Sequence, residues 1–270
     1  MGGPCVCDGR HVREEVFFTM TTVVRAKRRL LQGLRVADGY TRHPFDEEFG
    51  VRTSGLVAGR YLKSGHLHDR HATAYYGIAP SVFRTLLSHW QRSRSNTGIE
   101  EFSFIDLGAG MGRAVLLAAE LPFRQVTGVE LNPTLVRIAR RNLTVWRCLD
   151  RARAPMKITC GDAVEFQLPA GPVLAFMFNP FGATVMRRLL KAWSGRVAER
   201  PRQLDVIYVN NEQEHVLESE LLRRPGVARL FLGQIRRSRA DAIADHRILA
   251  SQPEGEYASS NVEDCSIWRL

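Results

Sequence analysis

The stretch FIDLGAGMGRAVLL, residues 104–117, decides the fold of this chain. It reads as a buried strand, a glycine loop and an apolar helix in direct succession, which is how a parallel β-α-β unit begins. Gly108, Gly110 and Gly112 allow a tight turn and a close approach of ligand to backbone, because no Cβ is in the way. The helix that follows offers unpaired N–H groups at its first turn. We therefore expect a ligand at this loop.

The spacing of the glycines indicates the kind of ligand. A dinucleotide fingerprint is G-x-G-x-x-G, with the pyrophosphate on the helix N-terminus. Here the third glycine comes one residue early, and Arg113 stands in its expected place. Asp106, two residues before the first glycine, would repel a pyrophosphate but suits a ligand with an ammonium or sulfonium group. The loop therefore favours S-adenosylmethionine (SAM) over a nicotinamide cofactor.

Outward from this loop, strand-like and helix-like segments alternate from about residue 78 onward. This pattern predicts a doubly wound α/β domain, with a mostly parallel sheet and helices on both of its faces. Ligands in such domains bind at the carboxyl ends of the strands. Strands are expected at 102–107, 125–131, 157–162, 173–179, 204–210, 227–235 and 265–270, and helices at 81–90, 112–121, 133–149, 183–193 and 214–224.

The first 75 residues follow a different pattern, with weak periodicity and many turn-forming residues. We expect residues 1–75 to be an N-terminal extension, flexible in part, that folds over the mouth of the site as a lid. One amphipathic helix is expected within it, at residues 16–37. Residues 76–270 are then the ligand-binding domain.

Two further acids end neighbouring strands. Glu130 closes VTGVE and can take both hydroxyls of a ribose. Asp162, in GDAVEF, is placed to accept a hydrogen bond from the exocyclic amine of adenine, with the Ala163 N–H opposite the ring. A glycine loop and two acids, in order on three successive strand ends, predict a SAM site, and we place the loop and strand-end neighbours Ala109 and Leu131 in it as well.

Four motifs carry a resemblance to a known family. FIDLGAGMGR, VTGVELNP, ITCGDAVEF and FMFNPFG resemble, in this order, those of class I (Rossmann-like) SAM-dependent methyltransferases, over about residues 75–270. The chain is most similar to uncharacterised bacterial members with DLGxGxGR, GVEL and NPFG motifs, and it also looks like the non-SET protein-lysine methyltransferases. The resemblance implies a seven-stranded sheet, SAM as methyl donor and in-line methyl transfer.

The resemblance also implies roles for particular residues. Asp106 and the three loop glycines would cradle the methionine part of SAM, Glu130 would bind the ribose and Asp162 the adenine. The segment AYYGIAPS, residues 74–81, falls where the lysine methyltransferases carry an aromatic-proline stretch over the cofactor. Tyr75 and Tyr76 are therefore candidate site residues.

The segment FNPFG, residues 178–182, is the candidate acceptor site. The side-chain oxygen of Asn179 and the backbone carbonyl of Pro180 can accept the N–H bonds of an amine and so orient its lone pair. Phe181 would pack on the substrate or the donor methyl, and we count Asn179 among the donor-contacting residues too. The NPPY and NPPF tetrads of amino-group methyltransferases work in this way, and this chain has one proline fewer. The alternative is that Asn-Pro only ends the strand and Phe181 fills the core.

Other polar residues leave alternatives open. Tyr75, Tyr76 or Glu212 would help to remove a proton from a lysine acceptor, or the proton simply leaves to water. Asn210 and Asn211 either line the acceptor pocket or cap the next helix. The segment GHLHDRH, residues 65–71, resembles a metal site in composition. Methyl transfer needs no metal, so we expect a solvated or lid-forming loop there and no metal ion.

Composition sets broader bounds. The net charge of +10 permits a nucleic-acid partner, but the arginines are scattered, so this partner is not favoured. The five cysteines contain no C-x-x-C, which favours free thiols over disulfides or zinc. No apolar run reaches the roughly 18–20 residues that cross a bilayer. We expect a cytoplasmic protein without membrane contact, and the sequence leaves its oligomeric state open.

The sequence thus predicts a SAM-dependent methyltransferase that acts on nitrogen, with a protein lysine as the favoured acceptor. A small-molecule amine and an RNA or DNA base are the other acceptors to consider. Two rival functions are a nicotinamide-dependent oxidoreductase and a SAM-binding protein without catalysis. Neither the composition nor the alternation of elements distinguishes among the acceptors.

Overall fold

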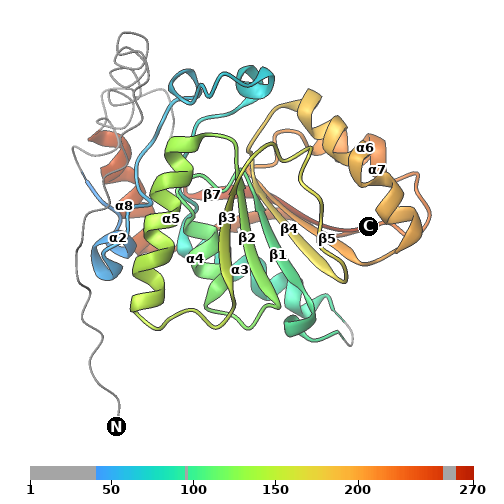
Figure 1. The fold of residues 1–270 in the computed structure, drawn as a ribbon, viewed down its shortest axis with the longest axis horizontal. Helices are drawn as coiled ribbons and strands as arrows, with labels where there is room; N and C mark the ends of the chain where they lie inside the picture. The colour runs from blue at the N-terminus through green and yellow to red at the C-terminus, as the bar shows by residue number, and fades with distance from the viewer. Residues whose placement is uncertain (1–40, 95–96, 252–259) are drawn as a thin grey trace, which may run out of the picture.

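The computed structural model describes residues 41–94, 97–251 and 260–270 (Figure 1). The helix expected at residues 16–37, and Cys5 and Cys7, lie outside these ranges. The three cysteines within them carry free thiols. In this described part of the chain, no helix combines the length and the apolar character that crossing a bilayer requires.

Seven strands form one sheet with the order β3-β2-β1-β4-β5-β7-β6 (Figure 1). The first five strands in sequence are parallel, and β7 runs antiparallel to both of its neighbours, β5 and β6. This arrangement is the Rossmann-like methyltransferase fold, so the predicted fold class is confirmed. The strands are β1 (Ser103–Leu107), β2 (Gln125–Glu130), β3 (Met156–Cys160), β4 (Val173–Phe178), β5 (Leu204–Val209), β6 (Ala228–Arg236) and β7 (Val262–Arg269).

Helices cover both faces of the sheet, and each face has its own apolar core. Figure 1 shows α5 and α6 on opposite sides of the strands. Side chains of α3, α4 and α5 pack together on one face, and those of α6 and α7 on the other. The helices are α2 (Pro44–Phe49), α3 (Pro80–Arg92), α4 (Arg113–Ala119), α5 (Pro133–Cys148), α6 (Ala183–Glu199), α7 (Glu214–Leu221) and α8 (Arg239–Ala250).

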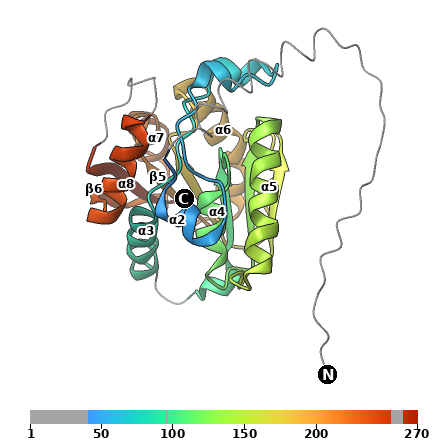
Figure 2. The ribbon, with the colours of Figure 1, turned by 90° about the vertical axis from the view of Figure 1, so that its left-hand side faces the viewer.

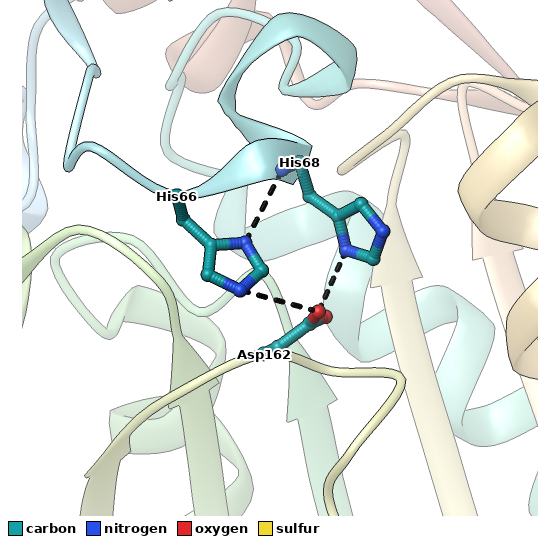
Figure 3. A group of neighbouring side chains, drawn as sticks. All are labelled: His66, His68 and Asp162. Atoms are coloured by element: carbon teal, nitrogen blue, oxygen red, sulfur yellow. Dashed lines mark hydrogen bonds and ion pairs between the residues drawn. The ribbon is translucent and has the colours of Figure 1, made fainter.

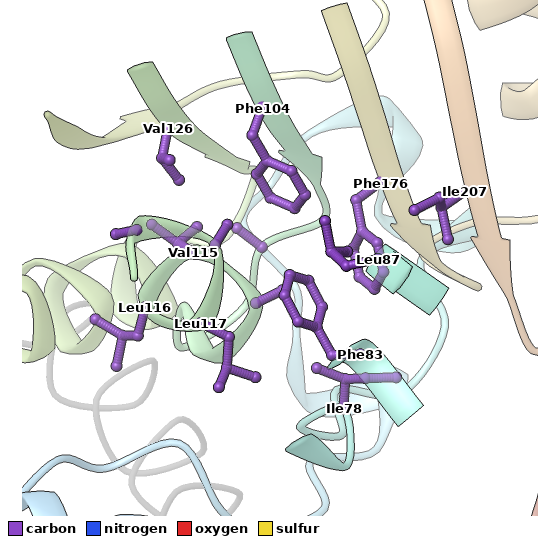
Figure 4. Close-up of a cluster of buried hydrophobic side chains, with 14 of the residues drawn as sticks. Ile78, Phe83, Leu87, Phe104, Val115, Leu116, Leu117, Val126, Phe176 and Ile207 are labelled. Carbon is purple, nitrogen blue, oxygen red and sulfur yellow. The ribbon is translucent and has the colours of Figure 1, made fainter. Parts of the chain in front are cut away.

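A group of aromatic rings fixes α3 to the middle of the sheet (Figure 4). The ring of Phe83 on α3 lies 5.9 Å from that of Phe104 on β1 and 5.3 Å from that of Phe176 on β4, both edge to face. Such pairs add about 0.5–1.5 kcal/mol each beyond the area they bury. β1 and β4 carry the glycine loop and the FNPFG segment at their ends, so this packing holds the two motifs side by side.

Residues 41–78 do not form a separate unit, because they pack onto the domain at several points. Arg113, at the start of α4, is 3% exposed and donates hydrogen bonds from its guanidinium to Thr53 Oγ1 at 2.6 Å, Ser54 Oγ at 3.0 Å and the Gly77 carbonyl at 3.2 Å. It also lies 3.7 Å from the buried carboxylate of Asp46. The arginine that replaces the expected third glycine thus binds the preceding segment to the glycine loop.

Helix α8 is the one long element that the sequence pattern did not predict. Its inward face carries two acids: Asp241 is 7% exposed and Asp245 is fully buried. Asp241 accepts a hydrogen bond from the Ser81 N–H at 2.8 Å, and Asp245 accepts one from the Tyr76 hydroxyl at 2.8 Å. Because these buried positions are charged, the helix lacks the apolar periodicity from which helices are recognised.

Candidate functional site

The glycine loop is packed between two other segments of the site. All three glycines have positive φ, with 54° at Gly110. A Cβ at Gly110 would lie 2.1 Å from the ring of Tyr75, and one at Gly108 would lie 2.4 Å from Pro180 Cβ. Glycine is required here for both its backbone conformation and its lack of a side chain. The loop, the aromatic segment and FNPFG therefore meet, as their expected positions on the strand ends require.

One cavity, called here the first cavity, gathers most of the predicted cofactor residues at the carboxyl ends of β1 to β4. Among its lining residues are Tyr75, Tyr76, Asp106, Gly108, Ala109, Glu130, Leu131, Asp162, Ala163, Pro180 and Phe181. Three predicted residues are not among them. Gly110 lies behind the wall and donates its N–H to Glu130, and Gly112 packs against Ala139. Asn179 lies on the wall of a second cavity, described below.

Two buried carboxyl groups lie at the centre of this cavity. Asp106 is 4% exposed, and burial together with the nearby charge of Glu130 raises its pKa to about 8. Burial also raises the pKa of Glu130, although the N–H groups of Gly110 and Asn132 each donate to its carboxylate at 2.8 Å. These two hydrogen bonds fix the orientation of Glu130. A pair of buried acids is stabilised in its ionised form by a cationic ligand.

The third acid, Asp162, is in contact with the histidine segment. Its Oδ1 accepts a hydrogen bond from the Val164 N–H at 2.9 Å. Its Oδ2 lies 2.6 Å from Nδ1 of His68 and 4.0 Å from Nε2 of His66 (Figure 3). The short helical turn Leu67–His71 therefore lies over the end of β3. The sequence shows the histidines, but nothing local in it indicates which strand end they reach.

The first cavity is narrow, because residues 62–78 cover it. We call these residues the covering segment. They contribute Leu62, His68 and the stretch from Ala72 to Ile78 to its wall. The volume is about 110 Å³, whereas binding sites for small ligands have about 300–1,000 Å³. The charged and polar groups on its wall suit the chemistry of SAM, but the volume is smaller than a ligand of that size needs.

The FNPFG segment lies between this cavity and another. Asn179 has a φ of 39°, its N–H donates to the Val209 carbonyl at 3.0 Å, and its Oδ1 accepts from the Tyr208 hydroxyl at 3.4 Å. The carbonyls of Asn179 and Pro180 accept from the side chain and the N–H of Thr73, respectively. The covering segment is therefore bound directly to the motif expected to hold the acceptor.

A second cavity, of about 650 Å³, adjoins the first. Asn179 and Asn210 lie on its wall, and Glu212 and Asp264 carry carboxylates there. Asn211 is not among its lining residues; its side chain donates to Glu214 at 3.2 Å, beside the start of α7. The two cavities share five wall residues: Ala72, Thr73, Ala74, Tyr76 and Phe178.

The two candidate tyrosines use their hydroxyls for structural contacts. Tyr75 donates to the Thr53 carbonyl at 2.7 Å, and Tyr76 donates to Asp245 Oδ1 at 2.8 Å. Burial raises the pKa of both hydroxyls well above the usual range. At neutral pH both keep their protons, so the geometry favours covering the site over accepting a proton from substrate.

Comparison with known proteins gives a short match and distant structural likenesses. No protein-family model matches the chain. A stretch of 41 residues is 54% identical to a release factor glutamine methyltransferase of Vibrio cholerae, and it spans 15% of this chain and 14% of the length of that relative. The tRNA methyltransferase TrmK of B. subtilis aligns at 8% identity over 72% of this chain and 66% of its own, with a TM-score of 0.48.

The plantazolicin methyltransferase BpumL, whose structure is in complex with SAH, aligns at 13% identity over 70% of this chain and 82% of its own. Its TM-score is 0.41. Likenesses this distant say nothing about the acceptor. The geometry of the two cavities is therefore the better guide to function.

Proposed function

We propose that the chain is a SAM-dependent methyltransferase. One observation carries the proposal: Asp106, Glu130 and Asp162, from three successive strand ends, line one cavity beside the glycine loop. The first two are buried carboxyls with raised pKa values, which a cationic ligand would stabilise in the ionised form. SAM carries both an ammonium and a sulfonium group, together with a ribose and an adenine for the other two acids.

SAM would supply a methyl group on a sulfonium, which is an excellent leaving group. The chain then needs to hold the donor, orient the acceptor and exclude water. We assign the methionine end to Asp106, the ribose to Glu130 and the adenine to Asp162. The covering segment excludes water, because Tyr75 and Tyr76 lie over the loop with their hydroxyls bonded to the protein.

We further propose that the acceptor is a nitrogen and that it binds in the second cavity. Asn179 lies on the wall of that cavity, whereas Pro180 and Phe181 line the first. The motif therefore lies between donor and acceptor, as an amine-orienting group must. The wall of this cavity carries both acidic side chains (Asp69, Glu212, Glu263 and Asp264) and basic ones (Arg60, Lys63, Arg70 and Arg237), so its charge does not select the acceptor. A protein lysine is the favoured acceptor on the resemblance of the sequence motifs. A small-molecule amine is the alternative, because a cavity of about 650 Å³ lies within the range of small-ligand sites.

Radiolabelled SAM and fractionated cell lysate test this proposal. Label in protein that resists nuclease, and that is released as methyl-lysine on hydrolysis, supports the lysine acceptor. Label confined to small molecules favours the alternative amine, and label only in nucleic acid contradicts an amine acceptor. Tight SAM binding without transfer to any fraction would indicate a SAM-binding protein without catalysis.

A thermal-shift comparison separates the donor from the rival cofactor. SAM or its product should raise the melting temperature, whereas NAD should leave it unchanged, because the loop has Arg113 where a dinucleotide fingerprint has its third glycine. Stabilisation by NAD and not by SAM would contradict the proposed function.

A further inference from the structure

The histidine turn carries a detail that methyl transfer by itself does not explain. His68 is 7% exposed and is enclosed between two charged side chains. Its Nε2 lies 2.7 Å from Nη1 of Arg188 on α6, and its Nδ1 lies 2.6 Å from Oδ2 of Asp162. Figure 3 shows the rings of His66 and His68 both turned toward Asp162.

These contacts decide which nitrogen of His68 carries the proton. A guanidinium has only hydrogen-bond donors, so the Nε2 that faces Arg188 must be an acceptor. The proton of the neutral ring is then on Nδ1, toward Asp162. The same argument applies to His66, whose Nδ1 accepts a hydrogen bond from the His68 N–H at 3.2 Å, which leaves the proton on Nε2. Both rings thus carry their proton on the nitrogen nearer to the carboxylate.

This proton arrangement opposes the metal site that the composition of the cluster suggests. His66, His68 and Asp162 do have ligand atoms within 4.8 Å of one another. A metal, however, needs the lone pair of the facing nitrogen, and a ligating histidine donates its other N–H to an acceptor. Here the other nitrogen of each ring faces a donor instead. The cluster is arranged to donate hydrogen bonds.

The N–H of His68 has hydrogen-bonding capacity left to use. Although Nδ1 lies 2.6 Å from Oδ2, this contact does not have hydrogen-bond geometry, and the buried Nδ1 has no hydrogen-bond acceptor among the residues that the structure describes. His68 also lines the first cavity, next to Asp162. A buried donor without a partner is costly, so a ligand that offers an acceptor at this point gains affinity. His68 and Asp162 together present a donor beside an acceptor.

Adenine presents the complementary pair, since its 6-amino group donates next to N7, which accepts. We propose that His68 is a specificity-determining residue for the donor: Nδ1–H of His68 donates to N7 of the adenine while Asp162 accepts from the 6-amino group. This inference rests on the proposed function, because it takes Asp162 as the adenine residue. Asparagine amides bind adenine in the same bidentate way, donating to N7 and accepting from the 6-amino group.

Calorimetric titrations of the full chain test the inference with S-adenosylhomocysteine and two analogues. The 7-deaza analogue lacks N7, and the 6-oxo analogue replaces the amino donor with an acceptor. Each ligand is titrated into the unaltered protein and into H68A and H68N. Asparagine places an N–H near the position of Nδ1, so H68N is the conservative variant. H71A is the matched control, because the His71 ring lies 6.3 Å from that of His68 and is not among the residues lining the first cavity.

We expect the unaltered protein and H71A to bind the 7-deaza analogue about three- to tenfold more weakly than S-adenosylhomocysteine, as the loss of one hydrogen bond predicts. In H68A this ratio should fall to one, and H68N should restore part of it. The ratio is independent of any general loss of affinity, so a merely structural role for His68 would not change it. An undiminished ratio in H68A would falsify the inference.

The 6-oxo analogue and zinc separate this inference from the proposed function. Equal binding of the 6-oxo analogue and S-adenosylhomocysteine would refute the assignment of Asp162 to the 6-amino group. The assignment of His68 to N7 would then fail as well, because it depends on that of Asp162. No binding of S-adenosylhomocysteine by the unaltered protein would refute the proposed function itself. Tight binding of Zn²⁺ to the ligand-free protein that is lost in H68A would assign the cluster to a metal and overturn the inference alone.

Discussion

Asp106 shows how one residue links the empty site to its ligand. Its carboxyl is buried beside Glu130, and its pKa of about 8 means that it holds a proton at neutral pH in the empty protein. A cation bound next to it favours the ionised form and lowers that pKa. Binding of the proposed donor should therefore be coupled to the release of a proton below pH 8.

The affinity for SAM should consequently depend on pH. Because the pKa of the empty site is raised, affinity is highest above pH 8 and falls as the pH decreases, by up to tenfold per unit. Titration calorimetry at pH 6, 7 and 8, in buffers of different ionisation enthalpy, measures both the affinity and the proton release. Asp106→Asn is the control, and it should bind weakly with a flatter profile. An affinity independent of pH in the unaltered protein would contradict the assignment of Asp106.

Asn179 is the residue at which binding and transfer should separate. Its side chain lies on the wall of the second cavity and not of the first. We expect Asn179→Ala to bind SAM almost normally and to slow transfer by about 10- to 100-fold, the loss typical of a misplaced reactant. Single-turnover methylation and calorimetry give the two quantities. Asn211→Ala serves as the control, because the side chain of Asn211 donates a hydrogen bond to Glu214 and does not line the second cavity. Equal loss of SAM binding and of transfer in Asn179→Ala would show that Asn179 supports the donor or the fold.

At the scale of elements, the buried Arg113 joins helix α4 to residues 41–78. Its guanidinium donates to two carbonyls of the covering segment, those of Gly77 and Ile78, and lies near the carboxylate of Asp46, which is 1% exposed. The segment that closes the first cavity is thereby attached to the helix that begins at the glycine loop. The covering segment and the glycine loop therefore stabilise each other.

Arg113→Met should therefore destabilise the protein by about 3–5 kcal/mol, because it removes the cation beside the buried carboxylate of Asp46 and leaves that charge with only its hydrogen bonds from Thr53 and Ser54. Urea unfolding followed by circular dichroism measures this change. The double variant Asp46→Asn with Arg113→Met should recover part of the loss, since the unpaired charge is then removed. Arg137→Met on the exposed face of α5 is the control and should change the free energy of unfolding little. A loss no larger than that of the control would show that the arginine does not hold the cover.

Hydrophobic periodicity in the sequence predicts most of the helices and strands of the domain. Most of the buried strands and amphipathic helices of residues 80–224 were predicted to within a few residues of their ends, because each follows one simple period, whereas α6 continues six residues beyond the predicted end, to Glu199. Helix α8 was missed because Asp241 and Asp245 occupy its buried face. Asp106, Glu130 and Asp162 were brought together as expected, since strand ends of a parallel sheet share one edge.

The contacts of the covering segment were beyond the reach of the sequence pattern. That His68 reaches Asp162, or that Arg113 reaches Gly77, depends on the path of a loop, and no local period encodes that path. The lid was predicted within residues 1–75, and among the described residues the part of the chain that lines the first cavity before α3 runs from Leu62 to Ile78. Packing onto the domain, not composition, determines where the cover ends.

For the whole molecule, the main feature is that two cavities share one wall. Ala72, Thr73, Ala74 and Tyr76 belong to both, and Thr73 is bonded to the FNPFG segment from this wall. If the first cavity binds the donor and the second the acceptor, as proposed, movement of the covering segment for one ligand would change the shape of the site for the other. The two sites form a single coupled system.

Hydrogen–deuterium exchange should detect this movement. We expect S-adenosylhomocysteine to slow amide exchange in residues 62–78 by at least several-fold, because the segment closes again over a filled cavity. Helix α7, which packs on the other face of the sheet away from the cover, is the internal reference and should not change. Protection confined to the glycine loop would show that the segment stays closed throughout.

The shared wall also has a kinetic consequence. If the cover must open to admit the donor and then close to complete the wall of the second cavity, the methyl acceptor meets a finished site only after the donor is in place. Turnover should then be ordered, with S-adenosylhomocysteine leaving last. Steady-state measurements would show S-adenosylhomocysteine as a competitive inhibitor with respect to SAM and a non-competitive one with respect to the acceptor. The ratio of SAM to S-adenosylhomocysteine in the cell, more than the concentration of acceptor, would then govern the rate.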